Sequence, residues 1–597
     1  MAALATTSSN GTPPPPPSLQ EATKSSTLVW QGHLEELFRR AKDRFPDVVW
    51  ELLSEEEEVV EEVWGHKGAL LSGIDEGVLI ILAIVYARAP PSFQSRYFSF
   101  RPIAQQGFES AVSLDASLAD RSASPVQGSS PTSGNPPSTT LRLSTSISPA
   151  LFSNELEYLY TGKGFGEAFE FLFDTTETRA EQDEQDGEAV RIDKLRKDLV
   201  FMWRSRLYSD VRLCLTGNFG SAGETTAIFS SHRFVLVSRS GYFHTALLAW
   251  PQKSQPGEPP TLNLPSPPFT PASLHFTLGF IYTGTLIFSH RSYDLSTAFA
   301  ILRASLYLSL PTLHDEIQAR IAQEMCHGLF HAFITFAEYE SLTGGKWGTG
   351  GCRCRQCARR APRVLEFATS VDVKNILLER GARRALVGMF GEGWCSPEFA
   401  ELSPKLREGI LKGVAKRTTV INVLPLLWAV EHGMAKMANV IDSWGDTVRE
   451  MMTNARRVID DVLCAKLDVV FDTSPDWEDI MKSDGVGFDD RERIDWVMAA
   501  ILRGLKETNA PGVYQALLSS VILKSKEDDD REAMLSPTSG VRALVEQTRE
   551  DVGKWMSKRW LGIRAERGFD SLEGWVMKEI SDRQSVSCFL SMLLTLA

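Results

Sequence analysis

Three cysteines lie close together in the segment GGCRCRQCARR, residues 350–360. Cys352, Cys354 and Cys357 fall within six residues, so their thiolates can converge on one soft cation such as zinc. A tetrahedral site needs a fourth ligand, and Cys395 in GEGWC is our first choice. The alternatives share a position shortly before the cysteine segment: Cys326, His327 and His331.

The cysteine spacing matches no named zinc finger, so two interpretations stay open. In one, a closed cluster holds a structural zinc ion and joins the loop to the helices that follow. In the other, the segment is a flexible surface loop with three reduced thiols. His327 and His331 are four residues apart, but the Gly-Leu-Phe between them lacks the glutamate of a metalloprotease helix, so we expect them to be packing residues.

Other patterns that could support catalysis are missing from the sequence. The segment TGKGFG, residues 161–166, lacks the Gly-x4-Gly-Lys-Ser/Thr order that cradles phosphates in a P-loop. No Gly-x-Ser-x-Gly elbow occurs, and no pair of carboxylates stands out from the general acidity. The sequence therefore predicts a protein that is not an enzyme.

Helices are the elements that would position the cysteines. In residues 362–585 apolar residues return every three or four positions, which predicts an α-helical domain. We expect residues 336–361 to form a Gly/Cys-rich loop before it and residues 586–597 to form an apolar tail after it. The tryptophans and methionines of this region are interpreted as core residues.

The N-terminal half of the chain repeats four landmarks in one order, which indicates two copies of one domain. In each copy a predicted helix is followed by a short strand, and ARAPPSFQSRYF at 87–98 in the first copy resembles LVSRSGYFHTAL at 236–247 in the second. The other three landmarks are matched as follows: Asp47 with Asp210, His66 with His232, and the corner Tyr160-Thr161-Gly162 with Tyr282-Thr283-Gly284. The segment TPASLHFTLGFIYTG predicts a helix that Gly284 closes in a left-handed cap.

Segments poor in apolar residues flank or interrupt these copies. Residues 1–27 are predicted to be a disordered tail, 112–148 a disordered insertion in the first copy, and 176–197 a charged linker. Residues 68–82 have no counterpart in the second copy and are interpreted as an insertion or a translated intron.

The string SDVRLCL, followed by FSSHRFVLVSRSGYFHTALL and TLGFIYTGTL, strongly resembles a BTB/POZ domain over residues 198–335. Residues 28–175 resemble a second, degenerate BTB domain. The tandem layout resembles a fungal group related to ankyrin-BTB cullin adaptors. The resemblance implies an α+β fold with two BTB/POZ domains before the α-helical domain.

The resemblance also implies a pairing surface near five polar residues: Asp210, His232, Arg233, Asp47 and His66. Asp210 and the His-Arg pair could equally form a satisfied buried polar group, since buried charges need partners. Two copies in one chain can pair with each other or form a homodimer. A linker that spans the sites raises the effective concentration to roughly the millimolar range.

Many BTB proteins recruit cullin scaffolds, and the resemblance makes Trp250 and Tyr282 candidates for that face. The loop LAWPQ, residues 248–252, lacks the acid that follows the apolar anchor in cullin binders. We expect a non-catalytic adaptor that links clients, bound by the helical half, to a cullin ubiquitin ligase. The alternative is a homotypic assembly scaffold or a transcription-related BTB protein without ligase recruitment.

Composition limits the partners and the compartment. A net charge of -13 and a pI of about 5.4 argue against general affinity for nucleic acid. The longest apolar run, GVLIILAIVYA, is about half of what a bilayer requires, so no membrane segment is expected. Eight cysteines in 597 residues are not a secreted disulfide framework, which favours a reducing compartment, the cytoplasm or the nucleus.

Overall fold

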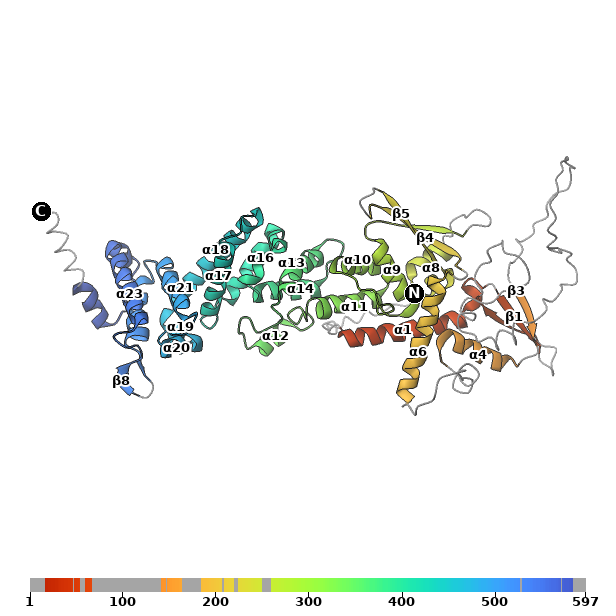
Figure 1. Cartoon of the computed structure of the whole chain (residues 1–597), viewed down its shortest axis with the longest axis horizontal. Helices are drawn as coiled ribbons and strands as arrows, with labels where there is room; N and C mark the ends of the chain where they lie inside the picture. The colour runs from red at the N-terminus through yellow and green to blue at the C-terminus, as the bar shows by residue number, and fades with distance from the viewer. Residues whose placement is uncertain are drawn as a thin grey trace, which may run out of the picture. The chain divides into compact units, whose positions relative to one another are not determined.

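The computed structural model describes residues 17–46, 48–53, 60–66, 141–145, 148–163, 184–206, 209–219, 224–249, 259–526, 529–570 and 572–582. It divides into two compact units, one spanning Pro17–Ala319 and one running from Arg320 towards the C-terminus (Figure 1). The insertion predicted at 68–82 and the tail predicted at 586–597 lie outside the described residues, as does most of the segment 112–148.

The first sequence copy forms a small sheet, and helices precede and follow its strands in the sequence. Its elements are α1 (Leu19–Arg39), the 3-10 turn η1 (Ala41–Asp43), β1 (Val48–Leu53), β2 (Val60–Gly65), β3 (Leu141–Thr145) and α4 (Pro149–Thr161). The strand order is β2-β1-β3, with β1 antiparallel to β2 and parallel to β3. Strand β3 corrects the prediction of disorder through residue 148, because the alternating segment LRLST pairs with β1 along its length.

The second copy repeats this topology. Its elements are α6 (Glu184–Arg204), β4 (Val211–Gly217), β5 (Thr225–Ser231), α7 (Arg233–Arg239), α8 (Gly241–His244), the π-turn η2 (Thr245–Ala249), β6 (Thr261–Leu264), α9 (Pro271–Thr283), α10 (Leu295–Tyr307) and α11 (Pro311–Arg320). The strand order is β5-β4-β6, with β4 antiparallel to β5 and parallel to β6. Helix α6 overlaps the predicted linker 176–197. Leu195 is buried there, whereas the other described residues of the overlap are exposed or half-buried.

The repeated corner has the same local structure in both copies. Helices α4 and α9 each contain 13 residues, begin with proline and end at a glycine. Gly162 and Gly284 adopt φ angles of 72° and 69°, the left-handed conformation that glycine enters without steric cost. Each donates its N–H to a carbonyl oxygen four residues earlier at 2.8 Å. The predicted glycine cap at residue 284 is therefore present.

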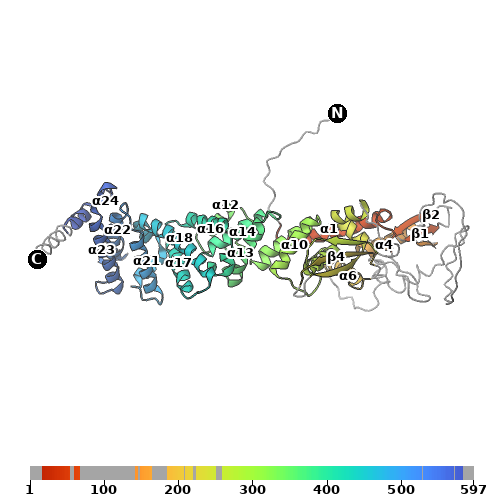
Figure 2. The same cartoon turned by 90° about the horizontal axis from the view of Figure 1, so that it is seen from above.

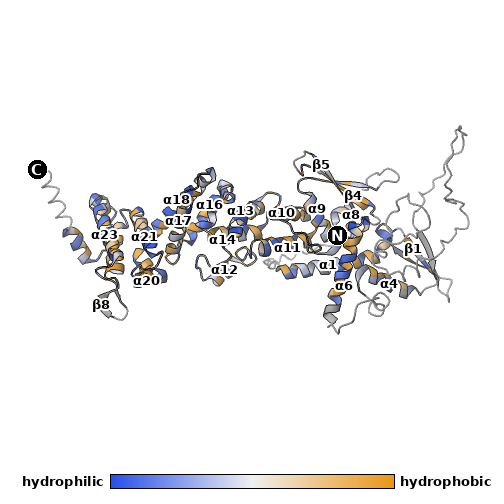
Figure 3. Cartoon of the chain, viewed as in Figure 1, coloured by the Kyte–Doolittle hydropathy of each residue, from blue (hydrophilic) through white to orange (hydrophobic). Residues whose placement is uncertain are grey.

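The unit that begins at Arg320 is a succession of helices with one short hairpin. Its elements are η3 (Ile321–Met325), α12 (Phe336–Thr343), α13 (Arg355–Thr369), α14 (Ile376–Gly388), η4 (Glu392–Trp394), α15 (Pro397–Ala400), α16 (Pro404–Arg417), α17 (Val423–Met437), α18 (Ser443–Ala465), α19 (Leu467–Thr473), α20 (Pro475–Lys482), α21 (Asp490–Arg503), α22 (Ala510–Leu517), η5 (Leu518–Ile522), β7 (Ser525–Lys526), β8 (Asp529–Ala533), α23 (Gly540–Lys558) and α24 (Trp560–Ala565). In both views the helices progress from α13 and α14 through α16, then α17 and α18, to α21 and finally α23 (Figures 1 and 2). Many of them carry both hydrophobic and hydrophilic residues, as amphipathic packing requires (Figure 3).

Two helices occupy much of the segment predicted as a loop at 336–361. Thr335 and Glu338 form a capping box at the start of α12, and the Cys354 side chain accepts the Cys357 N–H at the start of α13. Helix α13 continues through Pro362, which the prediction took as the beginning of the helical region. Within the described part of the chain, no helix has both the length and the apolar character to cross a membrane.

Candidate functional site

Tyr282, at the corner of the second copy, is fully buried and hydrogen-bonded. Its hydroxyl lies 2.7 Å from Nδ1 of His232 and 2.9 Å from Oγ of Ser231, and it accepts the His232 backbone N–H at 3.1 Å. Burial raises the pKa of Tyr282, although the hydrogen bonds from Ser231 and His232 oppose the shift. The corner tyrosine is thus a core residue, and the prediction that its side chain faces a cullin is wrong.

The first copy repeats this arrangement with Tyr160 and His66. The Tyr160 hydroxyl accepts the His66 backbone N–H at 3.2 Å and lies 2.9 Å from His66 Nδ1. His66 Nε2 lies 2.7 Å from the carbonyl oxygen of Arg44, which can only accept a proton, so Nε2 carries the hydrogen and Nδ1 accepts from the tyrosine. The histidine and tyrosine landmarks of each sequence copy are therefore joined by one hydrogen-bond pattern.

Asp210 and Arg233 form a satisfied polar pair beside β4. The Asp210 carboxylate accepts the Arg233 backbone N–H at 2.7 Å and its Nε–H at 2.8 Å, and only 7% of Asp210 is exposed. A satisfied buried polar pair was one of the two interpretations of these residues that the sequence left open. Asp47, the matched residue of the first copy, lies outside the described residues.

His66 and Arg233 also contact the other copy. The His66 ring stacks on Phe234 with ring centroids 4.5 Å apart and planes 18° apart. The Arg233 guanidinium lies 4.4 Å from the ring centroid of Phe45. Two of the residues predicted at a pairing surface, His66 and Arg233, thus contact the other copy within one chain.

Helix α1 extends this interface. Trp30 is fully buried and donates its indole N–H to the Tyr282 carbonyl oxygen at 3.0 Å. Ser26 donates to the Glu316 carboxylate at 3.1 Å, and Arg239 Nη1 lies 2.8 Å from His33 Nδ1. A helix that precedes the first sheet is therefore built into the core of the second copy.

A His/Cys cluster lies in the unit that begins at Arg320. The side chains of His327, Cys352, Cys354 and Cys357 bring their ligand atoms within 4.8 Å of one another. Nδ1 of His327 is 3.3 Å from Sγ of Cys352 and 3.5 Å from Sγ of both Cys354 and Cys357. This group of one imidazole and three thiols could hold a metal ion.

Two of the thiols belong to the start of α13. Cys354 is the N-cap, and its Sγ accepts the Cys357 N–H at 3.4 Å. Burial tends to raise the pKa of Cys354, but hydrogen bonds from Cys357 and Cys352 outweigh it and lower the pKa to about 6. Burial raises the pKa of Cys357. The N-terminus of α13 positions both thiols, and the positive end of its helix dipole stabilises a thiolate.

The three cysteines predicted as ligands come together, but the fourth member is His327 and not Cys395. The Cys395 thiol instead lies 3.8 Å from the carbonyl oxygens of Gly391 and Gly433, and burial raises its pKa to about 11. Cys326 is buried outside the cluster, with a pKa raised to about 12 by burial. His331 is also outside it, within a turn rather than on a helix.

Comparison with protein families decides what the second copy is. Its sequence matches the BTB/POZ domain family over residues 202–324. Residues 202–324 form a BTB/POZ domain. A comparison of the chain with curated proteins finds no match. The BTB domain implies protein partners and dimerisation, so the chain carries a protein-interaction module.

Sequence reasoning missed several interface residues of the BTB domain. Phe45, Phe234 and Trp30 were not singled out, although all three are large apolar residues next to landmarks or within a predicted helix. Trp250, the second cullin-face candidate, lies outside the described residues. Ile287 is the first exposed apolar residue after the BTB corner, with 67% of its surface accessible.

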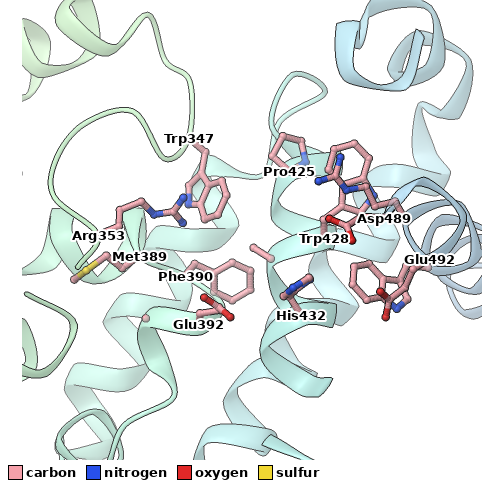
Figure 4. Close-up of a pocket in the computed structure, with 14 residues that line it drawn as sticks. Trp347, Arg353, Met389, Phe390, Glu392, Pro425, Trp428, His432, Asp489 and Glu492 are labelled. Carbon is pink, nitrogen blue, oxygen red and sulfur yellow. The ribbon is translucent and has the colours of Figure 1, made fainter. Parts of the chain in front are cut away.

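A pocket of about 450 Å³ lies in the helical unit (Figure 4). Aromatic rings form much of its lining: Trp347, Phe390, Trp428 and Trp496. Charged groups of both signs surround them, including Arg353, Glu392 and Asp489. Trp347 and Arg353 stand on one side of the pocket and Trp428 and Asp489 on the other. The pocket was not predicted from the sequence, because its rings are far apart in the chain: Trp428 and Trp496 lie on α17 and α21, and Trp347 and Phe390 lie in turns.

Proposed function

We propose that the chain is a non-catalytic scaffold in which two BTB-type domains pair with each other in cis. The second domain is the BTB domain at 202–324. The first, residues 28–175, is proposed as a degenerate copy because its strand order, its glycine-capped corner and its His66–Tyr160 hydrogen bond match those of the BTB domain. The tandem layout supports kinship with tandem-BTB adaptors.

The contact of His66 with Phe234 is the observation that carries this proposal. It joins a landmark of the first copy to the helix that follows the matching landmark of the second. Pairing in cis leaves the other surfaces of the BTB domain and the helical unit to bind partners. A chain built this way acts by holding proteins near one another in the cytoplasm or the nucleus.

A cullin scaffold is the partner we propose for the BTB domain, with clients held by the helical unit. The exposed apolar residue Ile287, next to the BTB corner, supplies a surface for it. The test is affinity purification of the full chain followed by detection of cullins. Co-purification should be lost in an Ile287→Asp, Trp250→Asp variant and kept in Ile421→Asp, which changes an exposed isoleucine of the helical unit. An unchanged cullin yield from the double variant rejects this face.

Two observations favour the alternative of a homotypic scaffold without ligase recruitment. The loop LAWPQ lacks the acid expected of a cullin binder, and Tyr282 is buried rather than available to a partner. A preparation that retains the paired domains but contains no cullin supports this alternative.

For the His/Cys cluster we propose zinc as the ion, in a structural rather than a catalytic role. Thiolate and imidazole are the donors that zinc prefers, and four protein ligands leave no coordination position for a substrate or a reactive water. The proposal of a non-enzymatic protein is consistent with such a closed site. Hydrolytic activity that depends on the ion would contradict it.

A further inference from the structure

The turn between the BTB match and α12 has an unusual backbone that needs an external restraint. Residues 327–331 all adopt positive φ angles: His327 47°, Gly328 91°, Leu329 41°, Phe330 50° and His331 53°. Only one of them is glycine. The left-handed region is sterically unfavourable for a non-glycine residue, so this run is unstable unless other interactions stabilise it.

Packing holds part of this turn against the cysteine segment. Phe330 is 98% buried, and a Cβ placed on Gly351 would come within 2.7 Å of its ring. A glycine at 351 therefore lets the backbone just before Cys352 approach the ring closely. Arg384 donates to the His331 carbonyl oxygen at 2.9 Å. These contacts bring His327 beside the thiols, but none of them binds the imidazole itself.

The donor spacing is that of a tetrahedral zinc site. Zinc–sulfur bonds of about 2.3 Å and zinc–nitrogen bonds of about 2.0–2.1 Å place the nitrogen about 3.5 Å from each sulfur. The three N–S distances from His327 are 3.3, 3.5 and 3.5 Å. The distances from the imidazole nitrogen to the three thiols thus suit one ion shared by His327 and the cysteines.

We infer that zinc bound by His327, Cys352, Cys354 and Cys357 locks the left-handed turn to the cysteine segment and so builds one wall of the pocket in the helical unit. The inference rests on zinc being the ion proposed for the cluster. Binding of a structural zinc ion is coupled to folding, so it can stabilise a turn that is unfavourable by itself.

The connection to the pocket runs through Arg353. This residue lies between two of the ligands, and its guanidinium stacks on Trp347 at 4.3 Å from the ring centroid. Trp347 is held separately, by donating its indole N–H to the Val387 carbonyl oxygen at 3.1 Å and its backbone N–H to Asn422 at 3.0 Å. Fixing Cys352 and Cys354 on an ion therefore fixes Arg353 against an anchored ring (Figure 4). Loss of the ion would allow Arg353 to move away from Trp347 and so open this side of the pocket.

Metal analysis of the full chain and of single variants tests the ligand set. The purified protein should contain about one zinc ion per chain. Cys354→Ser and His327→Ala should reduce the zinc content at least tenfold, whereas His327→Cys should retain it as a four-thiolate site. Cys395→Ser and His331→Ala are matched controls that should retain zinc. A zinc-free chain that takes up no added zinc, or loss of zinc from Cys395→Ser alone, overturns the inference.

Trypsin digestion tests the effect on the turn and the wall. Arg353 and Arg355 are exposed and lie between the cysteines of the cluster. They should become cleavage sites when loss of the ion lets residues 352–357 unfold locally. A zinc chelator should accelerate cleavage there at least tenfold in the normal chain, and added zinc should reverse it. The Cys354→Ser variant should be cleaved rapidly with or without the chelator. Equal cleavage rates with and without zinc overturn the inference.

The outcomes separate this inference from the scaffold proposal. A chain whose BTB-type domains pair but which holds no zinc contradicts the proposed zinc ion together with the metal-built wall, and leaves the scaffold proposal intact. A chain that holds zinc but is cleaved equally fast with and without the chelator contradicts only the metal-built wall. A chain that holds zinc but whose domains do not pair contradicts only the scaffold.

Discussion

His66 Nδ1 lies 2.9 Å from the Tyr160 hydroxyl, and His232 Nδ1 lies 2.7 Å from the Tyr282 hydroxyl. The two pairs occupy matching positions around two sheets of identical strand order. Each histidine ends the second strand or follows it directly, and each tyrosine lies in the last turn of the helix before a left-handed glycine. The likeness between the copies thus extends to individual hydrogen bonds.

Stability of the N-terminal unit should fall as the pH is lowered from about 6.5 to about 4. Burial lowers the pKa of His66 from 6.5 to about 4, and its hydrogen bond to the Arg44 backbone only partly opposes this. Between pH 6.5 and pH 4 the His66 imidazole is protonated in the unfolded state but remains neutral in the folded state. Protonation therefore stabilises the unfolded state. The free energy of unfolding should decrease by up to about 3 kcal/mol at pH 4, and should not decrease above pH 7. Urea unfolding at several pH values measures it.

His66→Gln should flatten this pH dependence, although His33 and His275, whose pKa values burial also lowers, leave part of it. His290→Gln, a change at an exposed histidine, should leave the profile unchanged. A His66→Gln profile as steep as that of the normal chain would show that His66 is not a buried neutral residue.

Gly284→Ala should destabilise the N-terminal unit much more than Gly162→Ala. Both glycines have positive φ, which costs alanine about 1 kcal/mol. A Cβ at residue 284 would also lie 2.5 Å from the Trp30 side chain, whereas the nearest atom to a Cβ at residue 162 is 3.8 Å away. The clash adds about 1–3 kcal/mol to the first variant only. Equal losses in denaturant unfolding would mean that α1 does not pack on the BTB corner.

Arg503→Met should destabilise the helical unit by about 3 kcal/mol, because it leaves two buried acids without their main partner. Arg503 pairs with Asp460 at 2.9 Å and with Glu431 at 2.7 Å, and the side chains of these acids are 6% and 10% exposed. Lys412→Met breaks an ion pair whose side chains are 70% and 63% exposed, so it should leave the stability almost unchanged. Thermal unfolding compares the two, and similar losses would rule out a structural role for the Arg503 pairs.

The sequence was sufficient for features that local chemistry determines. The helix of the second corner was predicted because Gly284 marks its end, and the BTB domain because its landmarks keep their order. Strand β3 was missed, since the Ser/Thr/Pro-rich residues around LRLST hide a strand whose hydrogen bonds come from β1, far away in the chain. Tyr282 was placed on the surface because sequence alone does not show which side of a corner faces the core.

The His/Cys cluster was likewise predicted only where its ligands are close together in the sequence. Three ligands share one segment and were found from spacing. His327 was only an alternative, because its approach depends on a left-handed turn that no residue pattern predicts. Cys395 was preferred on chemical type, but the packing around Gly391 and Gly433 places it elsewhere.

The central claim is that the two BTB-type domains pair within one chain, and photo-crosslinking from residue 45 tests it most directly. Phe45 replaced by p-benzoylphenylalanine would put the reactive group beside Arg233, whose guanidinium lies 4.4 Å from the Phe45 ring. We predict a crosslink to the segment of residues 231–239 in a product that runs as a single chain on a denaturing gel. A product of twice the chain mass, or no crosslink to that segment, would contradict pairing in cis.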